Sequence, residues 1–205
     1  MQIDTEAIVC GVRGHGEHGT IVRMLSPDHG MVAAYVRGGR GRRVRPILIP
    51  GNTVSAQLRW RTENQLPQAT VELVQSRAPI LSEPLPSAGI DWVTSLVTAA
   101  LPERQPYPRL YQAMGGLLDA IEAAPSAIGW SSALVRFEQL LVAEVGYARP
   151  ETDFIEGQSP AGWSEILAAL NRSSRQLFGE LLTGRVEALQ DSRSRLLDRL
   201  ARAAR

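Results

Sequence analysis

Hydrophobic and polar residues alternate in short runs over the first 75 positions of the chain. In the run Val54, Ala56, Leu58 and Trp60 every second residue is apolar, which is the period of a strand with one buried face. We predict five strands, at 5–12, 20–25, 31–36, 53–60 and 69–74. Glycine, proline and aspartate gather between these runs and favour turns. Five antiparallel strands on short connections predict a small Greek-key barrel.

Beyond residue 78 the apolar residues recur at helical spacing instead. Residues 79–86 are rich in proline, and we predict an extended linker there. The segment 134–145 is apolar on most faces, which indicates the central helix of a bundle. We expect Ser131 or Ser132 to cap its start and Gly146 to end it. Ser159-Pro160 predicts the start of a later helix.

These patterns predict an α+β protein. It consists of a five-stranded antiparallel barrel over 1–78, a linker over 79–86 and an all-α helical domain over 87–205.

An arginine-rich segment separates the third and fourth predicted strands. The net charge of the chain is only +1, yet residues 1–80 hold ten arginines against six acidic residues. No acidic residue lies between Asp28 and Glu63, and this interval contains Arg37, Arg40, Arg42, Arg43, Arg45, Arg59 and Arg61. We call residues 37–45 the arginine loop and expect a flexible connection, because glycines separate its arginines.

Guanidinium groups stay protonated, so they serve poorly as catalytic bases and well as ligands of phosphate. We predict that the five arginines of the arginine loop bind nucleic-acid phosphates and that Arg59 and Arg61 bind further phosphates along a strand. A merely solvated connection is the alternative. Because Tyr35 and Trp60 are the aromatic residues of this region, we expect little base stacking and a strongly salt-dependent affinity.

Other candidate chemistry is weak. Residues 14–19, Gly-His-Gly-Glu-His-Gly, match the spacing of a dinucleotide-binding loop, but a strand-like run follows where that loop requires a helix. His15 and His18 supply half a metal site, and Cys10 has no partner thiol. We therefore expect a buried, inert thiol, a hairpin turn at 14–19, no cofactor and no enzymatic activity.

The amino terminus has no apolar signal core, and no window of the sequence approaches 18 uninterrupted apolar residues. We expect a cytoplasmic protein without a membrane partner.

Several segments resemble the RecO family of recombination mediators. Residues 26–40, Ser-Pro-Asp-His-Gly-Met-Val-Ala-Ala-Tyr-Val-Arg-Gly-Gly-Arg, and 46–54, Pro-Ile-Leu-Ile-Pro-Gly-Asn-Thr-Val, resemble its amino-terminal domain. Residues 134–141, Leu-Val-Arg-Phe-Glu-Gln-Leu-Leu, with Gly146-Tyr147 resemble its Arg-Phe-Glu helix. Residues 191–197, Asp-Ser-Arg-Ser-Arg-Leu-Leu, are similar to its carboxy-terminal Ser-Arg signature.

The resemblance implies an OB-fold followed by a helical domain, with binding of single- and double-stranded DNA and strand annealing. It also implies that the protein acts together with RecR and single-strand-binding protein to load RecA on gapped DNA in the nucleoid. Many members carry a four-cysteine zinc site where this chain has 153–157, Asp-Phe-Ile-Glu-Gly. We therefore expect no metal here and a helical domain held by apolar packing alone, through Trp130, Phe137, Phe154 and Trp163.

Two other functions remain open from the residues. One is a protein-interaction scaffold, and the other is an RNA-binding protein that uses the arginine loop as an RGG-like segment. Arg136 is a candidate receptor for a partner's acidic tail, but an ion pair with Glu138 or Glu144 is the favoured explanation.

Overall fold

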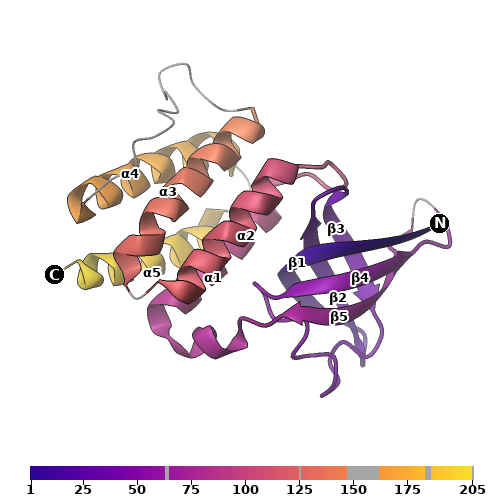
Figure 1. Ribbon diagram of the computed structural model, residues 1–205. Helices are drawn as coiled ribbons and strands as arrows, with labels where there is room; N and C mark the ends of the chain where they lie inside the picture. The colour runs from indigo at the N-terminus through magenta and orange to yellow at the C-terminus, as the bar shows by residue number, and fades with distance from the viewer. Residues whose placement is uncertain (63–64, 125, 147–161, 183–185, 205) are drawn as a thin grey trace. The chain divides into compact units, whose positions relative to one another are not determined.

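The computed structural model describes residues 1–62, 65–124, 126–146, 162–182 and 186–204 (Figure 1). Contacts divide the chain into two compact units. The barrel unit comprises Met1–Ser82 with Leu101–Tyr111, and the helical unit comprises Glu83–Ala100 with Gln112–Arg205. Strands precede helices along the chain, so the predicted α+β class is confirmed.

Five strands of the barrel unit close into a barrel in the order β1-β2-β3-β5-β4 (Figure 1). They are β1 Gln2–His15, β2 Gly19–Ser26, β3 Gly30–Val36, β4 Thr53–Arg59 and β5 Gln68–Gln75. Neighbours are antiparallel except β3 and β5, which run parallel where Tyr35 pairs with Gln68. The sheet is mixed, so the prediction of five antiparallel strands is wrong in this respect. In a closed ring with an odd number of strands, one neighbouring pair must run in the same direction.

The interior of the barrel is filled by small and branched apolar side chains. They form one cluster that includes Val9, Val22, Val32, Ala34, Val54, Leu58 and Ala69. The alternation from which the strands were predicted is therefore the alternation between interior and exterior. Cys10 is buried, as expected, and its burial raises the pKa of the thiol to about 12.

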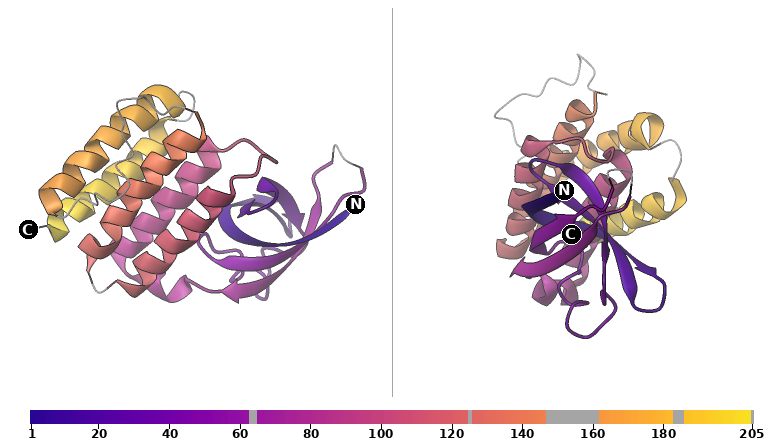
Figure 2. Two further views of the ribbon diagram at one scale, coloured as in Figure 1. Left: turned by 45° about the horizontal axis from the view of Figure 1, so that its top comes forward. Right: turned by 90° about the vertical axis from the view of Figure 1, so that its right-hand side faces the viewer.

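The described helices are α1 Pro84–Ala100, α2 Pro108–Ala123, α3 Ala127–Glu144, α4 Trp163–Gln176 and α5 Val186–Ala203. A π-helical turn, Leu177–Leu181, follows α4. In the helical unit the helices lie side by side with roughly parallel axes (Figure 2). Helix α1 packs on α5, and α3 packs on α4.

Two details of the helical part differ from the prediction. Residues 79–86 are not extended, because Ala78–Ser82 form a 3-10 helix and α1 begins at Pro84, a position in the first turn where proline is tolerated. Helix α3 begins at Ala127, seven residues before the predicted segment 134–145, and the Ser131 hydroxyl donates to the Ala127 carbonyl instead of capping the helix.

Two further expectations concern helix ends. Gly146 follows the last turn of α3 with φ +89°, as predicted for the end of this helix. Ser159-Pro160 lie outside the described residues.

The helical unit is not held by apolar packing alone. Trp130 and Phe137 are buried as predicted, Trp163 is half-buried, and Phe154 lies outside the described residues. In addition, Arg193 on α5 forms a buried ion pair with Glu138 on α3. The apolar prediction missed this pair because its members lie far apart in the sequence.

The connection between α1 and α2 belongs to the barrel unit, although the sequence placed it in the helical domain. The Arg104 amide donates to the Met31 carbonyl over 2.9 Å, and the Tyr111 hydroxyl donates to a Glu6 carboxylate oxygen over 3.0 Å. Gly30 has φ +65°, and a Cβ there would lie 1.8 Å from the Gln105 carbonyl oxygen. The connection and the β2–β3 turn therefore fit only with glycine at position 30.

Among the helices of the described ranges, none has the length and apolar character needed to cross a bilayer.

Candidate nucleic-acid interface

The arginine loop opens a folded connection between β3 and β4. Successive turns are closed by hydrogen bonds from Gly41 N–H to the Gly38 carbonyl over 2.8 Å and from Arg45 N–H to the Gly41 carbonyl over 2.9 Å. Val44, Ile47 and Leu48 pack against the barrel interior. The connection thus contains hydrogen-bonded turns and packed side chains, which the glycine-rich composition did not indicate. The apolar run at 46–50 is not a strand either, because prolines at both of its ends provide no amide for a ladder.

The end of this connection is fixed by Asn52, which is fully buried. Its side-chain amide donates to the Pro46 and Ile47 carbonyls over 3.1 Å each, and its side-chain oxygen accepts the Arg77 amide hydrogen over 2.9 Å. The Arg77 guanidinium is itself buried and donates to the Gly51 carbonyl over 2.7 Å. Buried polar groups with this many partners hold the backbone in one conformation.

All seven arginines that the sequence singled out have exposed side chains: Arg37, Arg40, Arg42, Arg43, Arg45, Arg59 and Arg61. Across the described ranges, none of them forms an ion pair with a carboxylate. The Arg40 guanidinium donates to the Gly16 carbonyl over 3.2 Å, which places its charge on the β1–β2 turn. These seven charges are therefore available to an anionic ligand.

Tyr35 on β3 lies against the same β1–β2 turn. Its ring meets the His15 ring edge-on at 5.9 Å between centroids. A Cβ on Gly19 would lie 2.3 Å from the Tyr35 ring, so this contact requires glycine at the start of β2. The glycines of the 14–19 segment thus serve a hairpin turn, as predicted, between the end of β1 and the start of β2.

Arg59 and Arg61 line a hollow of about 380 Å³ beside the end of β4. Its other lining residues are Tyr35, Trp60, Gln65, Leu66 and Gln68. Tyr35 therefore links the two groups of arginines, because it borders this hollow and also contacts the end of β1, next to the turn to which the Arg40 guanidinium donates.

Strand register adds one residue that the sequence analysis missed. Arg59 pairs with Gln68, which pairs with Tyr35; Tyr35 pairs with Ile21, and Ile21 pairs with Arg13. Directly paired residues point to the same side of a sheet, so Arg13 shares the outer face of Arg59 and Tyr35. It is exposed. The alternation of apolar residues did not reveal Arg13, because the first predicted strand ended at Val12.

The arrangement suits binding rather than catalysis. The interface offers permanent cations and two aromatic rings, whereas guanidinium is no general base. His15 contacts Tyr35, and His18 is exposed beside Glu17. No cluster of three or more potential metal ligands occurs among the described residues.

Two family models match the chain. The model described as "Recombination protein O N terminal" matches residues 1–77, and "Recombination protein O C terminal" matches residues 82–153. The first match covers the barrel and the arginine loop, and the second covers α1 to α3.

Curated relatives share the name DNA repair protein RecO. The protein of Phenylobacterium zucineum is 38% identical over 148 residues, which span 72% of this chain and 60% of the relative. The protein of Sinorhizobium medicae is 37% identical over 181 residues, or 88% of this chain and 70% of the relative. The protein of Cereibacter sphaeroides is 30% identical over 99% of this chain and 100% of its own length. That alignment, 244 positions, is longer than this chain of 205 residues, so the relative carries segments that this chain lacks.

Proposed function

This chain belongs to the RecO family of DNA repair proteins, and on that premise we propose that it is a non-catalytic DNA-binding mediator of recombinational repair. The observation that carries the proposal is the set of exposed arginines without carboxylate partners on the barrel unit. Cations placed in this way bind the phosphates of any sequence, because phosphate contacts carry no base information.

The barrel supports a more specific assignment as an OB-fold. Barrels of this class have five strands and bind oligonucleotides on the strand 2–3 face and on the loops that join strands 1 to 2 and 4 to 5. Here Tyr35 and Arg40 lie at the β1–β2 turn, and Arg59 and Arg61 lie where β4 leads into the connection to β5. The positions of Arg40, Arg59 and Arg61 near these two loops support the proposal that they bind single strands.

Strand annealing follows from the same charges. Two complementary strands repel each other through their phosphates, and a surface that neutralises both lowers this repulsion. The five arginines of the arginine loop are all exposed on one short connection, so they could contact phosphates of two strands at the same time. Single- and double-stranded DNA both carry the phosphates that this surface would bind.

The partners are proposed from the family. RecR and single-strand-binding protein would contact this chain in the cytoplasm at the nucleoid, and RecA would be loaded indirectly on gapped DNA. We assign DNA binding to the barrel unit, Met1–Ser82 with Leu101–Tyr111, and protein contacts to the helical unit.

The test is the salt dependence of binding to a single-stranded oligonucleotide. Replacing Arg40, Arg42, Arg43 and Arg45 by alanine should weaken binding to all sequences alike. Each lost phosphate contact on a single strand lowers the slope of log affinity against log salt by about 0.7, so four contacts would lower it by about 3. The matched control replaces Arg172, Arg175, Arg195 and Arg202, which are exposed arginines of α4 and α5.

A slope that the loop variant leaves unchanged, or that the control variant lowers equally, would refute the role of the arginine loop. Competition with RNA of equal length separates the RNA-binding alternative, since a preference for RNA would favour it. A protein-interaction scaffold would bind neither nucleic acid at low salt.

A further inference from the structure

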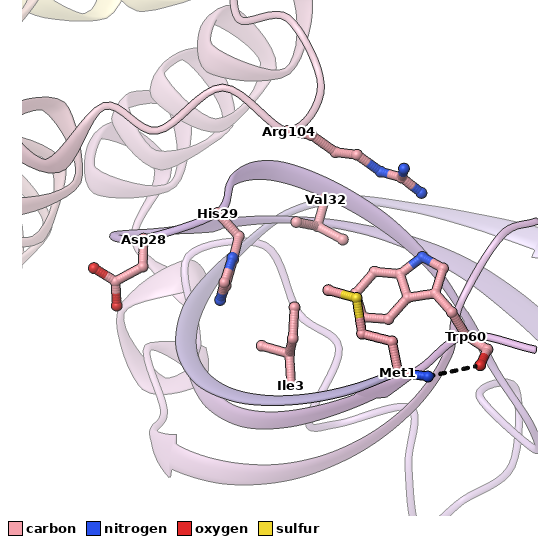
Figure 3. A pocket seen from close by; sticks show the side chains of 7 residues that line it. All are labelled: Met1, Ile3, Asp28, His29, Val32, Trp60 and Arg104. Carbon is pink, nitrogen blue, oxygen red and sulfur yellow. Dashed lines mark hydrogen bonds between the residues drawn. The ribbon is translucent and has the colours of Figure 1, made fainter. Parts of the chain in front are cut away.

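A second hollow, of about 310 Å³, opens at the end of the barrel (Figure 3). It is lined by Met1, Ile3, Asp28, His29, Val32, Trp60 and Arg104. All of these residues belong to the barrel unit. In the close view Ile3 and Val32 supply apolar surface, Trp60 stands at one side, and Arg104 extends across the opening (Figure 3).

Arg104 is held in place by its backbone. Its φ of 61° lies in the left-handed region, which costs a residue with a Cβ about 1 kcal/mol or more. The hydrogen bond from the Arg104 amide to the Met31 carbonyl and the β-bridge between Met31 and Glu103 fix this conformation. The guanidinium carbon then lies 5.9 Å from the centroid of the Trp60 ring. A strained backbone thus sets a flat cation opposite a flat aromatic ring.

Trp60 carries a polar group that lacks a partner. Its indole N–H is buried, and no hydrogen-bond acceptor contacts it within the described part of the chain. A buried donor without a partner costs free energy, so a ligand that supplies an acceptor here would be favoured. Trp60 also lines the hollow formed with Arg59 and Arg61, so it contributes to both hollows.

We propose that the Trp60–Arg104 hollow receives one unstacked base of a bound single strand, while Arg59 and Arg61 bind the neighbouring phosphates. An aromatic ring and a guanidinium plane are the two surfaces on which proteins stack splayed bases. Every base carries hydrogen-bond acceptors on its edges, whereas a phosphate would gain nothing from the apolar surface of Ile3 and Val32. This inference rests on the proposed DNA-binding function and revises the expectation that stacking contributes little.

The test compares two oligonucleotides of equal length and equal phosphate count, one of thymidines and one of abasic sites. Wild-type protein should bind the thymidine strand about 5- to 100-fold more tightly, the range that one base–aromatic stack supplies. Trp60→Leu should abolish this preference, leave affinity for the abasic strand intact and leave the salt slope unchanged. Trp60→Phe should restore most of the preference, because it keeps an aromatic face. Trp163→Leu, at a half-buried tryptophan of the helical unit, is the matched control and should change nothing.

A second readout covers the case in which Trp60→Leu fails to fold. Trp60 is the one tryptophan that the sequence places in the barrel unit. The thymidine strand should quench wild-type fluorescence more than the abasic strand does, and Trp60→Phe should lose the difference while still binding DNA.

The outcomes distinguish this inference from the function on which it rests. If wild-type protein binds both strands equally, or if Trp60→Leu weakens both equally, the base pocket is refuted. If the arginine-loop variant still lowers the slope of log affinity against log salt, the proposed DNA-binding function remains supported. If neither strand binds at low salt, both proposals fall together.

Discussion

Arg193 and Glu138 form an ion pair in the interior of the helical unit, where the guanidinium donates to both carboxylate oxygens. The Nη2–Oε2 distance is 2.9 Å, and the side chains are 3% and 0% exposed. Trp92 donates to the same carboxylate over 2.7 Å, and its ring lies 4.8 Å from the guanidinium carbon. Ser173 donates to the second oxygen. One carboxylate thus joins α1, α3, α4 and α5, and all of its neighbours are donors.

We predict that removing either charge of this pair destabilises the protein strongly. Glu138→Gln or Arg193→Met leaves the other charge buried without its partner, which costs about 3–5 kcal/mol of unfolding free energy. Urea denaturation measures the loss. The control is Arg195→Gln, which breaks an ion pair with Asp91 whose side chains are 58% and 54% exposed, and it should cost less than about 1 kcal/mol. Equal effects of the buried and exposed pairs would contradict the assignment.

The strands were predictable because each has one face inside the barrel and one outside. Apolar residues therefore recur at every second position of the sequence. The turns of the β3–β4 connection were missed, although Val44, Ile47 and Leu48 have the i, i+3, i+4 spacing of a face that packs. Composition alone, rich in glycine and arginine, indicated a flexible segment. Hydrogen bonds of Asn52 and Arg77 hold the end of this connection in place. Arg77 lies after β5, 25 residues beyond Asn52, so the local sequence does not reveal these bonds.

The site was predictable only as far as charge alone determines it. The seven arginines are exposed, as the absence of acidic residues between Asp28 and Glu63 indicated. The hollow at Trp60 was not predictable, since Arg104 reaches it from the connection after α1. The partner of Glu138 was not predictable either. Arg136 is its neighbour in the sequence, but both carboxylate oxygens of Glu138 bind Arg193 on α5.

We predict that Asn52→Ala loosens the connection that carries the arginine loop. The change leaves the Arg77 amide and two carbonyls without their partner, which should lower the unfolding free energy by about 1–3 kcal/mol. Limited trypsin digestion reads out the local effect, because the enzyme cleaves after arginine and exposed arginines occupy the segment. Cleavage at Arg42 and Arg43 should be faster than in the wild type. Asn171→Ala, at an exposed position of α4, should leave the digestion pattern unchanged.

We predict that Cys10 makes the protein sensitive to alkaline pH. Burial raises the thiol pKa from 9.0 to about 12, so the folded state holds this proton more tightly than the unfolded state does. Its stabilising effect is complete below pH 9 and is lost as the pH rises toward 12, at about 1.4 kcal/mol per pH unit.

Urea unfolding at pH 8 and pH 10 measures this effect. Between these values the wild type should lose about 1.4 kcal/mol more than Cys10→Ala, which has no thiol to ionise. Parallel losses in the two proteins would show that the thiol proton plays no part.

The barrel unit includes residues 101–111, which are synthesised only after helix α1. Contacts of Arg104, Gln105 and Tyr111 with the β2–β3 turn and β1 do not exist while the nascent chain ends at Ser82. At roughly 5–20 residues per second, the strands wait for seconds before their last neighbours emerge. The barrel unit is therefore synthesised in two parts separated by α1, and the surface that residues 101–111 later contact stays uncovered during the interval.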